Sequence, residues 1–338
     1  GLDGGVGELP KELGPVEGDA EWASWVPSYA ADGVLCHDAT YGSEGLRIVG
    51  RVCEPDVGSD FPILIYNDEL GRYADSPGDV RAWAKMGFAV FQSAYRGVGG
   101  SDGRIELCKG EVYDVRRMLQ IAKTHPSADP SRIAMVGYSH GGCIGTKVLL
   151  GEMIAETTTF EAFVNVYGPS DIAAAFQSQK DFADNDPLCK TYAKECAELK
   201  ATVVALEAVL TDVPGDRRTL PWADHLARTN TPLLFLHATG DAAVPFRQSC
   251  DLAAAIGDFQ GWHQDGVAGA NAETVPEGCS GEGIDWRTTG ALPNVTFSAD
   301  RILVVADTPP PLGHARNVGK GATLDARARA FVADKLAN

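Results

Sequence analysis

The sequence predicts an α/β fold in which a mostly parallel, twisted sheet carries helices on both faces. Short apolar runs alternate with helix-compatible segments from residue 62 to residue 336, and this alternation is typical of parallel strands joined by helices. A chain of 338 residues, 44% of them hydrophobic, can bury such a sheet in one domain with insertions. A Gly-x-Ser-x-Gly sequence at residues 137–141, directly after one apolar run, is the third indication.

The composition excludes several classes of protein. The formal net charge is −17, so nucleic acid and anionic membrane surfaces would be repelled. The chain has no apolar run near the roughly 18 residues that a membrane-spanning helix needs. We therefore expect a small neutral or cationic ligand, no nucleic-acid partner and no membrane span. The residues say nothing of the oligomeric state.

Eight cysteines are an even and rather high number for this length, which favours an exported protein with disulfides over a set of buried thiols. We therefore predict a secreted protein, or one of the periplasm or cell envelope. No Cys-x-x-Cys or His-Glu-x-x-His spacing is present, so we expect no metal ion and no other cofactor. Eight cysteines permit many pairings and the sequence cannot choose among them; one complete set joins Cys36 with Cys53, Cys189 with Cys196, Cys108 with Cys143 and Cys250 with Cys279.

The first part of the chain predicts a leader and a hairpin. Residues 1–20 are rich in Gly, Pro and acidic residues, which is typical of a flexible leader. Residues 34–36 and 46–53 are strand-like, and residues 38–45 between them have the composition of a turn, so we expect an antiparallel hairpin that opens the sheet. The next expected elements are a strand at 62–66, a helix at 77–86, a strand at 88–95 and a helix at 111–124.

The second part predicts an interrupted sheet. A strand at 133–136 leads into residues 137–141, a helix follows, and residues 160–167 are the next strand. Residues 172–229 carry no strand signal, and residues 192–210 have an apolar stripe at helical spacing. We therefore predict a helical cap insertion at 172–229 in a core of residues 21–171 and 230–338. The core continues with a strand at 231–237, a helix at 248–256, a strand at 300–306 and a helix at 323–336, and no regular structure is assigned to 261–297.

Residues 137–141 predict a nucleophile elbow, which is a sharp turn from a strand into a helix with a serine at its tip. The turn imposes unusual backbone dihedral angles on Ser139 and leaves no room for side chains beside it, so small residues are needed at Gly137 and Gly141. The helix that follows directs free N–H groups and a partial positive charge at the same place.

A serine hydroxyl is a weak nucleophile at neutral pH and needs a base that a carboxylate orients. Such partners must lie at the ends of other strands, on the edge of the sheet that carries Ser139. Asp241 follows the strand at 231–237, and His314 lies in the loop after the strand at 300–306. The order Ser139, Asp241, His314 is the one found in the nucleophile-elbow class, so these three are the predicted catalytic residues.

Each assignment has an alternative. Asp241 could instead cap the helix that follows it, and Asp171, also at the end of a strand, is the other candidate acid. His314 could be a solvated loop residue. We expect structural or surface roles for the six remaining histidines. His140 follows the serine on the elbow helix and His237 lies within a strand, while four lie in loops or the cap without a matching acid: His37, His125, His225 and His263.

The oxyanion that develops during acyl transfer needs fixed N–H donors. We expect one to be the backbone N–H of His140, directly after the serine, and the other the backbone N–H of Glu69 in the loop at 67–70. The side chains of Asp68 and Glu69 would oppose an anion, so only the backbone can serve there. Aromatic residues are predicted to shape the substrate pocket, with a place in the core as the alternative: Tyr138, Phe182, Tyr192 and Trp222.

Several stretches, in matching order, resemble one superfamily. They are residues 45–55, 95–103, 110–114, 132–146, 231–241, 244–245 and 313–314. Through them, most of residues 40–336 is similar to the α/β-hydrolase superfamily, specifically to the prolyl-oligopeptidase-like and dienelactone-hydrolase-like serine hydrolases. The resemblance implies an α/β-hydrolase fold, a triad of Ser139, Asp241 and His314, and hydrolysis through an acyl-enzyme.

The chain departs from that family in two respects. Members usually carry His-Gly in the loop where this chain has Asp68 and Glu69, so the second oxyanion donor differs. Peptidases of the prolyl oligopeptidase type carry a large β-propeller ahead of the catalytic domain, and the residues before position 40 are too few to supply one. We therefore expect a serine carboxylesterase that acts on a small-molecule ester. The alternatives are a peptidase or amidase of the same fold and a hydrolase fold without activity that binds a ligand.

Overall fold

The computed structural model describes residues 11–18, 20–213, 215–264, 276, 279, 283–287, 299–307, 314 and 323–337. Within these residues eleven strands form one sheet. Their order is β1 (Trp22–Ala31), β2 (Val34–Ser43), β3 (Leu46–Pro55), β5 (Ala89–Ser93), β4 (Phe61–Asn67), β6 (Ala128–Tyr138), β7 (Ala162–Val166), β8 (Leu233–Ala238), β11 (Arg301–Ala306), β9 (Phe259–Gln264) and β10 (Ile284–Trp286). The pairs from β1 to β5 are antiparallel, and every pair from β5 to β10 is parallel.

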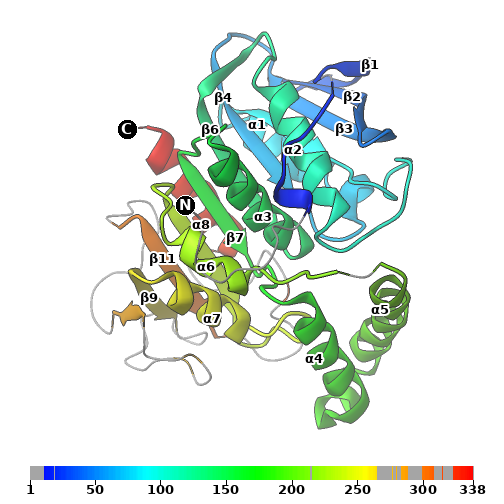
Figure 1. The fold of residues 1–338 in the computed structure, drawn as a ribbon, viewed down its shortest axis with the longest axis vertical. Coiled ribbons are helices and arrows are strands. Elements are labelled where there is room, and N and C mark those ends of the chain that lie inside the picture. The colour runs from blue at the N-terminus through cyan, green and yellow to red at the C-terminus, as the bar shows by residue number, and fades with distance from the viewer. Residues whose placement is uncertain are drawn as a thin grey trace.

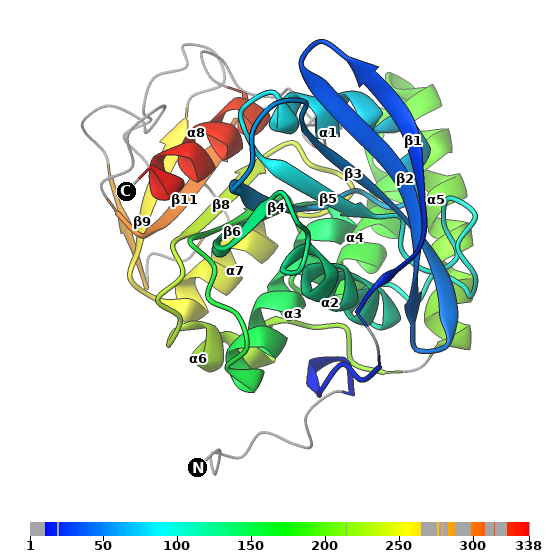
Figure 2. The same ribbon diagram turned by 90° about the horizontal axis from the view of Figure 1, so that it is seen from above.

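Helices cover both faces of the sheet (Figures 1 and 2). One face carries α2 (Gly110–Ala122), α3 (His140–Ala155), α6 (Ala223–Leu226) and α7 (Arg247–Ile256). The opposite face carries α1 (Pro77–Ala84) and α8 (Leu324–Leu336). The described residues also form four short 3-10 turns: η1 (Lys11–Leu13), η2 (Arg72–Asp75), η3 (Pro187–Lys190) and η4 (Leu220–Trp222).

The core consists of two apolar layers, one on each face of the sheet. Phe163 and Val164 are neighbours on β7 and point to opposite faces, so Phe163 packs in the layer with Met118 of α2 and Val164 in the layer with Phe331 of α8. Every residue of β5, β7 and β8 is buried, because helices screen both faces of these strands from water. The predicted α/β class with a mostly parallel sheet is therefore confirmed.

A helical segment interrupts the sheet between β7 and β8. It contains α4 (Ile172–Asn185) and α5 (Ala193–Asp212), which pack against each other and stand away from the sheet (Figure 1). The apolar stripe of α5 is turned inward, with Cys196 and Val203 buried. No helix among the described residues has the length and apolar character that crossing a membrane requires.

Three segments of the structure differ from the sequence prediction. The hairpin turn expected over residues 38–45 is confined to Glu44 and Gly45, which have φ of 48° and 78°; two left-handed residues match the twist of the paired strands. Strand β1 was not among the predicted elements; it lies at the edge of the sheet, where a proline such as Pro27 is tolerated. The sequence assigns no regular structure to residues 261–297, and the structure places the end of β9 and all of β10 there; most other residues of that range lie outside the described part.

All eight cysteines are paired, and the pairing is the one complete set named from the sequence: Cys36–Cys53, Cys108–Cys143, Cys189–Cys196 and Cys250–Cys279. The first bond joins β2 to β3, and the third joins η3 to α5. The second joins the loop before α2 to Cys143 of α3. Because Cys143 lies four residues after Ser139, this covalent bond restrains the helix that follows the nucleophile elbow.

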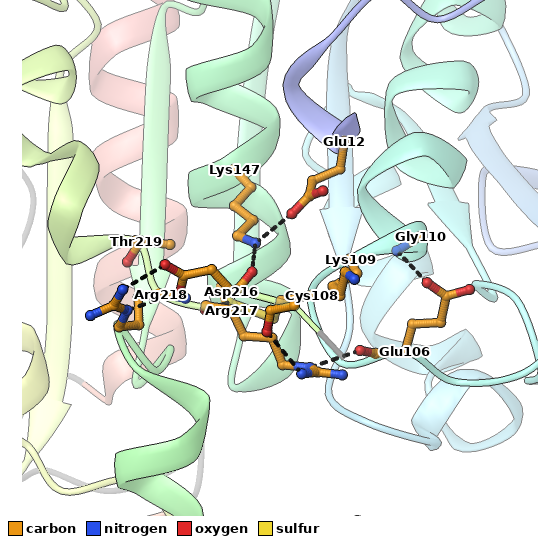
Figure 3. A network of polar contacts seen from close by, with 12 residues as sticks. Glu12, Glu106, Cys108, Lys109, Gly110, Lys147, Asp216, Arg217, Arg218 and Thr219 are labelled. Carbon is orange, nitrogen blue, oxygen red and sulfur yellow. Dashed lines mark hydrogen bonds and ion pairs between the residues drawn. A yellow bond between two sulfur atoms is a disulfide. The ribbon is translucent and has the colours of Figure 1, made fainter. Parts of the chain in front are cut away.

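A buried polar network ties the start of the described chain to α3 (Figure 3). The ammonium of Lys147, on α3, lies 2.9 Å from Glu12 Oε1 in η1 and donates to the carbonyl of Asp216 at 3.2 Å. Both side chains are buried, with exposed fractions of 1% for Lys147 and 6% for Glu12. Burial lowers the pKa of Lys147, and the charge of Glu12 opposes that shift.

Residues 11–18 therefore differ from the flexible leader expected for residues 1–20. Leu13 is buried beside Glu12, and Arg116 on α2 donates hydrogen bonds to the carbonyls of Glu12 and Gly14. Composition alone did not indicate this packing, because it depends on an ammonium on α3 that requires a carboxylate. Residues 1–10 lie outside the described part of the chain.

Replacing Glu12 by Ala should lower the free energy of unfolding by about 3 kcal/mol, because it leaves the Lys147 charge buried without its partner. Urea unfolding followed by circular dichroism measures the change. Glu17→Ala is the control, since that side chain is exposed and its loss should cost less than about 0.5 kcal/mol. Equal losses in the two variants would contradict this role of the ion pair.

Candidate active site

Ser139 stands at the junction of β6 and α3, at the C-terminal edge of the sheet. Its backbone dihedrals are φ 52° and ψ −121°, a strained conformation for a residue with a side chain. The turn leaves no room for a side chain at either flanking glycine. A Cβ on Gly137 would lie 2.2 Å from the carbonyl oxygen of Gly141, and a Cβ on Gly141 would lie 2.3 Å from the carbonyl oxygen of Asn67. Only glycine fits at these two positions, as the elbow predicts.

Asp241 lies in the turn that follows β8, and its side chain is fully buried. Oδ1 accepts hydrogen bonds from the backbone N–H groups of Ala243 at 2.9 Å and Val244 at 2.8 Å. Oδ2 lies 2.8 Å from Nδ1 of His314 and 3.2 Å from Nε2 of His237. Four nitrogen atoms thus surround a carboxylate that has no access to water.

His314 bridges the acid and the serine. Its Nε2 lies 2.9 Å from Ser139 Oγ, and its Nδ1 lies 2.8 Å from Asp241 Oδ2. The ring packs against Tyr167, with the ring centres 4.6 Å apart. Three side chains that are distant in the sequence therefore form one continuous line of hydrogen bonds, at the ends of β6 and β8 and after β11.

The environment keeps Asp241 ionised and makes His314 more basic. Burial alone would raise the pKa of Asp241, but the charge and hydrogen bond of His314 and the hydrogen bond of His237 outweigh it, so the pKa lies well below its ordinary value. For His314 burial acts in the opposite direction, and the charge and hydrogen bond of Asp241, together with the charge of Glu69, raise the pKa. A proton transferred to His314 would thus be held next to a fixed negative charge.

The structure assigns local roles to two of the alternative candidates. Asp171 is the N-cap of α4, where its side chain accepts the N–H of Ala174 at 3.0 Å. The His140 imidazole is buried, its Nε2 accepts the N–H of Cys108 at 3.1 Å, and burial lowers its pKa to about 3. His140 is therefore a neutral structural residue.

The other histidines expected to be structural have partners away from Ser139, except His237; the expected lack of an acid partner is wrong for His125 and His263. His37 stacks on Trp25, His225 packs against Trp222, His125 contacts Glu54, and His263 contacts Asp307. His237 instead contacts the buried carboxylate of Asp241. The sequence interpretation missed this contact, although the spacing of four residues between His237 and Asp241 was a signal that a tight turn after the strand could bring them together.

The predicted oxyanion donors differ in their surroundings. His140 is the first residue of α3, so its backbone N–H has no acceptor within the helix. The backbone N–H of Glu69 instead donates to Asp68 Oδ1 at 2.8 Å, which the sequence did not indicate. The Glu69 carboxylate accepts the hydroxyl of Tyr167 at 2.7 Å and lies 3.6 Å from Arg72.

A cavity of about 330 Å³ opens beside Ser139 and His314. Its wall is largely apolar and comes from the loops after β4, β7 and β8 and from α4 and α5. The carboxylates are those of Glu69 and Glu198, and no lysine or arginine is among the described lining residues. The apolar part of the lining is Leu70, Leu107, Pro169, Ile172, Ala175, Phe176, Leu199, Leu206, Ala243 and Val244.

The four aromatic residues predicted for the pocket are absent from this described lining. Tyr138 belongs to the apolar layer under α8, and its hydroxyl donates to Asp325 at 2.7 Å. Trp222 is buried in the layer on the other face. Phe182 and Tyr192 are partly exposed at the end of α4 and the start of α5. The pocket is instead lined by aliphatic residues and Phe176, because those are the faces that α4 and α5 turn toward the serine.

No group of three or more His, Cys, Asp or Glu side chains among the described residues is arranged to hold a metal ion. The chemistry that the arrangement offers is that of an activated hydroxyl, with a base and a buried carboxylate behind it. Fold and site together define an α/β-hydrolase of the serine hydrolase class.

Comparison with known proteins assigns the family. The model of the prolyl oligopeptidase family matches residues 76–268, more than half of the chain. The chain therefore belongs to the prolyl oligopeptidase family. The "Uncharacterized peptidase YtmA" of Bacillus subtilis (strain 168) is 28% identical over 154 residues, which are 44% of this chain and 57% of the relative. This chain thus spans little more than half the length of that relative.

Solved structures share the fold at low sequence identity. The rice cell wall degrading esterase LipA from Xanthomonas oryzae superimposes with a TM-score of 0.52 and 13% identity, over 71% of this chain and 88% of that one. An acetyl xylan esterase from Paenibacillus sp. R4 gives a TM-score of 0.48 and 17% identity, over 69% and 77% of the two chains. At this identity the likeness to LipA speaks for the fold alone.

Replacing Gly141 by Ala should destabilise the protein by about 3 kcal/mol, because the new methyl group would overlap a backbone carbonyl that cannot move away. Thermal and urea unfolding measure the loss. Gly42→Ala is the matched control, since a Cβ there meets nothing within 4 Å. If both variants unfold like the parent protein, the elbow is looser than these contacts imply.

Proposed function

We propose that this chain hydrolyses carboxylic esters through an acyl-enzyme formed on Ser139, with His314 as the base and Asp241 as the residue that orients it. The observation that carries the proposal is the unbroken line of contacts from Ser139 Oγ to His314 and on to Asp241, at 2.9 and 2.8 Å. The first distance suits transfer of the serine proton to the imidazole, and the second suits a hydrogen bond that orients the ring.

The reaction runs in two halves. Ser139 Oγ attacks the ester carbonyl carbon while His314 Nε2 takes the hydroxyl proton, and the carbonyl electrons move onto the oxygen. When the tetrahedral intermediate collapses, the same proton passes to the leaving alcohol and the acyl-enzyme remains. A water molecule then attacks the acyl carbonyl carbon and gives a proton to His314, and this proton passes to Ser139 Oγ as the acid is released. Asp241 keeps Nε2 directed at the reacting oxygen and stabilises the imidazolium.

The negative charge that develops on the carbonyl oxygen needs hydrogen-bond donors, and the start of α3 can supply them. The backbone N–H of His140 is well placed for this role, because a helix N-terminus presents unpaired N–H groups and a partial positive charge. The neutral, buried imidazole of His140 fixes the loop at Cys108 and so helps to hold this helix end in place.

The cavity supports a neutral or cationic ester with an apolar part. Its wall is apolar apart from a few polar groups, among them Glu69 and Glu198, and the net charge of the chain is −17. An acyl group that carries a carboxylate would be repelled here. On this proposal, residues 172–229 act as a cap whose helices α4 and α5 form the outer wall of the pocket.

Four disulfides support a location outside the reducing cytoplasm. We infer that the protein works in a secreted state or in the periplasm or cell envelope.

Two observations favour a second candidate, a peptidase or amidase. The family model is that of the prolyl oligopeptidases, and the matched relative is called a peptidase. The same triad cleaves either bond, and the difference lies in protonating an amine as it leaves rather than an alcohol. The ratio of kcat/KM for matched esters and arylamides decides between the two.

Ser139→Ala should lower kcat/KM for p-nitrophenyl esters by at least about 10⁴-fold, because it removes the hydroxyl that attacks the carbonyl carbon. The parent protein should also be labelled by a fluorophosphonate probe, and Ser139→Ala should not. Ser59→Ala, an exposed serine, is the control. Turnover that survives in Ser139→Ala would exclude the mechanism, and a parent protein that neither labels nor turns over would favour a binding role.

The pH dependence of kcat/KM should show an acid limb with its midpoint above about 6.5, the ordinary pKa of histidine. The base is active only when neutral, and the charges of Asp241 and Glu69 raise the pKa of His314, so activity is lost at a higher pH than for an unperturbed histidine. Glu69→Gln removes one of these charges and should move the midpoint to lower pH. A midpoint below 6.5 in the parent protein, or no movement in Glu69→Gln, would contradict this electrostatic account.

A further inference from the structure

His237 is the last but one residue of β8, and its side chain has no exposed surface. Nδ1 lies 2.7 Å from Ser249 Oγ on α7. Nε2 lies 2.9 Å from the carbonyl oxygen of Val244 and 3.2 Å from Asp241 Oδ2. The imidazole therefore sits directly behind the carboxylate that contacts His314.

The partners of Nε2 fix where its hydrogen is. A carbonyl oxygen can only accept a hydrogen bond, so the contact with Val244 requires a hydrogen on Nε2. Nε2 also lies 3.2 Å from Asp241 Oδ2, so the carboxylate lies beside the positive end of this N–H group. This holds whether the ring is neutral or charged, because both forms with a hydrogen on Nε2 donate there.

We propose that His237 is a positioning residue for catalysis, acting through Asp241: its Nε2–H fixes the plane and the charge distribution of the carboxylate that orients His314. This inference rests on the proposed function of Ser139, Asp241 and His314.

Counting donors on Asp241 shows what His237 contributes. Oδ1 receives two backbone N–H groups, from Ala243 and Val244, and Oδ2 has two imidazole nitrogens beside it, His314 Nδ1 at 2.8 Å and His237 Nε2 at 3.2 Å. Without His237, Oδ2 would have His314 as its remaining donor of this set, in a place that water does not reach. The two N–H groups would still hold Oδ1, but Oδ2 would be less restrained, and the His314 ring could shift with it, away from Ser139.

The His237 imidazole also reduces the negative charge density on Asp241 Oδ2. A donor on that oxygen draws electron density from it, so the oxygen holds the His314 proton less tightly. The other groups that face the two rings stay in place when His237 is changed: Tyr167 packs near both, and Glu69 lies near His314. Removing the Nε2–H should therefore raise the pKa of His314 as well as loosen its orientation.

Three variants of His237 and one of Ser249, the hydrogen-bond partner of its Nδ1, test the proposal. His237→Phe keeps a ring and removes both nitrogens. His237→Gln can place an amide N–H near the position of Nε2, whereas His237→Asn reaches only the position of Nδ1. Ser249→Ala removes the partner of Nδ1 and leaves the Nε2–H in place. Each purified full-length variant is assayed for kcat and KM against pH on the ester that the parent protein turns over best, and its folding is checked by thermal unfolding.

We expect His237→Phe and His237→Asn to lower kcat by about 10- to 100-fold with KM within about twofold, the size that a small misplacement of a catalytic group produces. Their acid limb should move to higher pH. His237→Gln should recover most of kcat and the parent acid limb, and Ser249→Ala should stay close to the parent. The comparison of Gln with Asn remains decisive if His237→Phe does not fold.

An unchanged kcat and acid limb in folded His237→Asn would overturn the proposal, as would equal activity of the Gln and Asn variants. These outcomes differ from a failure of the proposed function, in which Ser139→Ala would retain turnover whatever residue stands at 237.

Discussion

Burial of one carboxylate governs the geometry of this site. Asp241 has no exposed side-chain surface, and a buried charge without donors costs several kcal/mol. Its donors come from the turn that follows β8, from His237 within β8 and from His314 in a distant segment. The need to satisfy both oxygens therefore couples the turn after β8 to the position of His314, and this places the proposed base 2.9 Å from Ser139 Oγ.

Backbone strain sits at the ends of two adjacent strands. Ser139 and Tyr167 have φ of 52° and 44°, and each such residue costs on the order of 1–3 kcal/mol. Neighbouring strands hold them in place: the N–H of Ser139 donates to Val166 at 2.9 Å, and that of Tyr167 to Leu236 at 2.7 Å. The buried sheet thus supports a serine lifted toward the cavity and a tyrosine ring packed against His314.

Much of the fold could be predicted, because buried parallel strands are continuous apolar runs and the helices between them keep their periodicity. The three residues proposed as catalytic followed from their places at strand ends, which does not require knowledge of side-chain rotamers. The features that were missed depend on contacts across the fold. The burial of Glu12 depends on Lys147, the role of His237 on a tight turn, and the pocket wall on which faces α4 and α5 present.

The loop after β4 limits what its backbone can add to the proposed reaction. The N–H of Glu69 is already bonded to Asp68 Oδ1, and Asp68 is held in turn by Gln92 at 3.1 Å and, through its carbonyl, by Tyr95 at 3.2 Å. An oxyanion would have to take that N–H from a carboxylate, so the gain would be only the difference between two charge-assisted hydrogen bonds. The first turn of α3 has no such competitor within the helix. On the proposed mechanism, the larger share of oxyanion stabilisation would therefore come from the helix end at His140, where the Cys108–Cys143 disulfide and the hydrogen bond from the Cys108 N–H to the His140 imidazole hold the backbone.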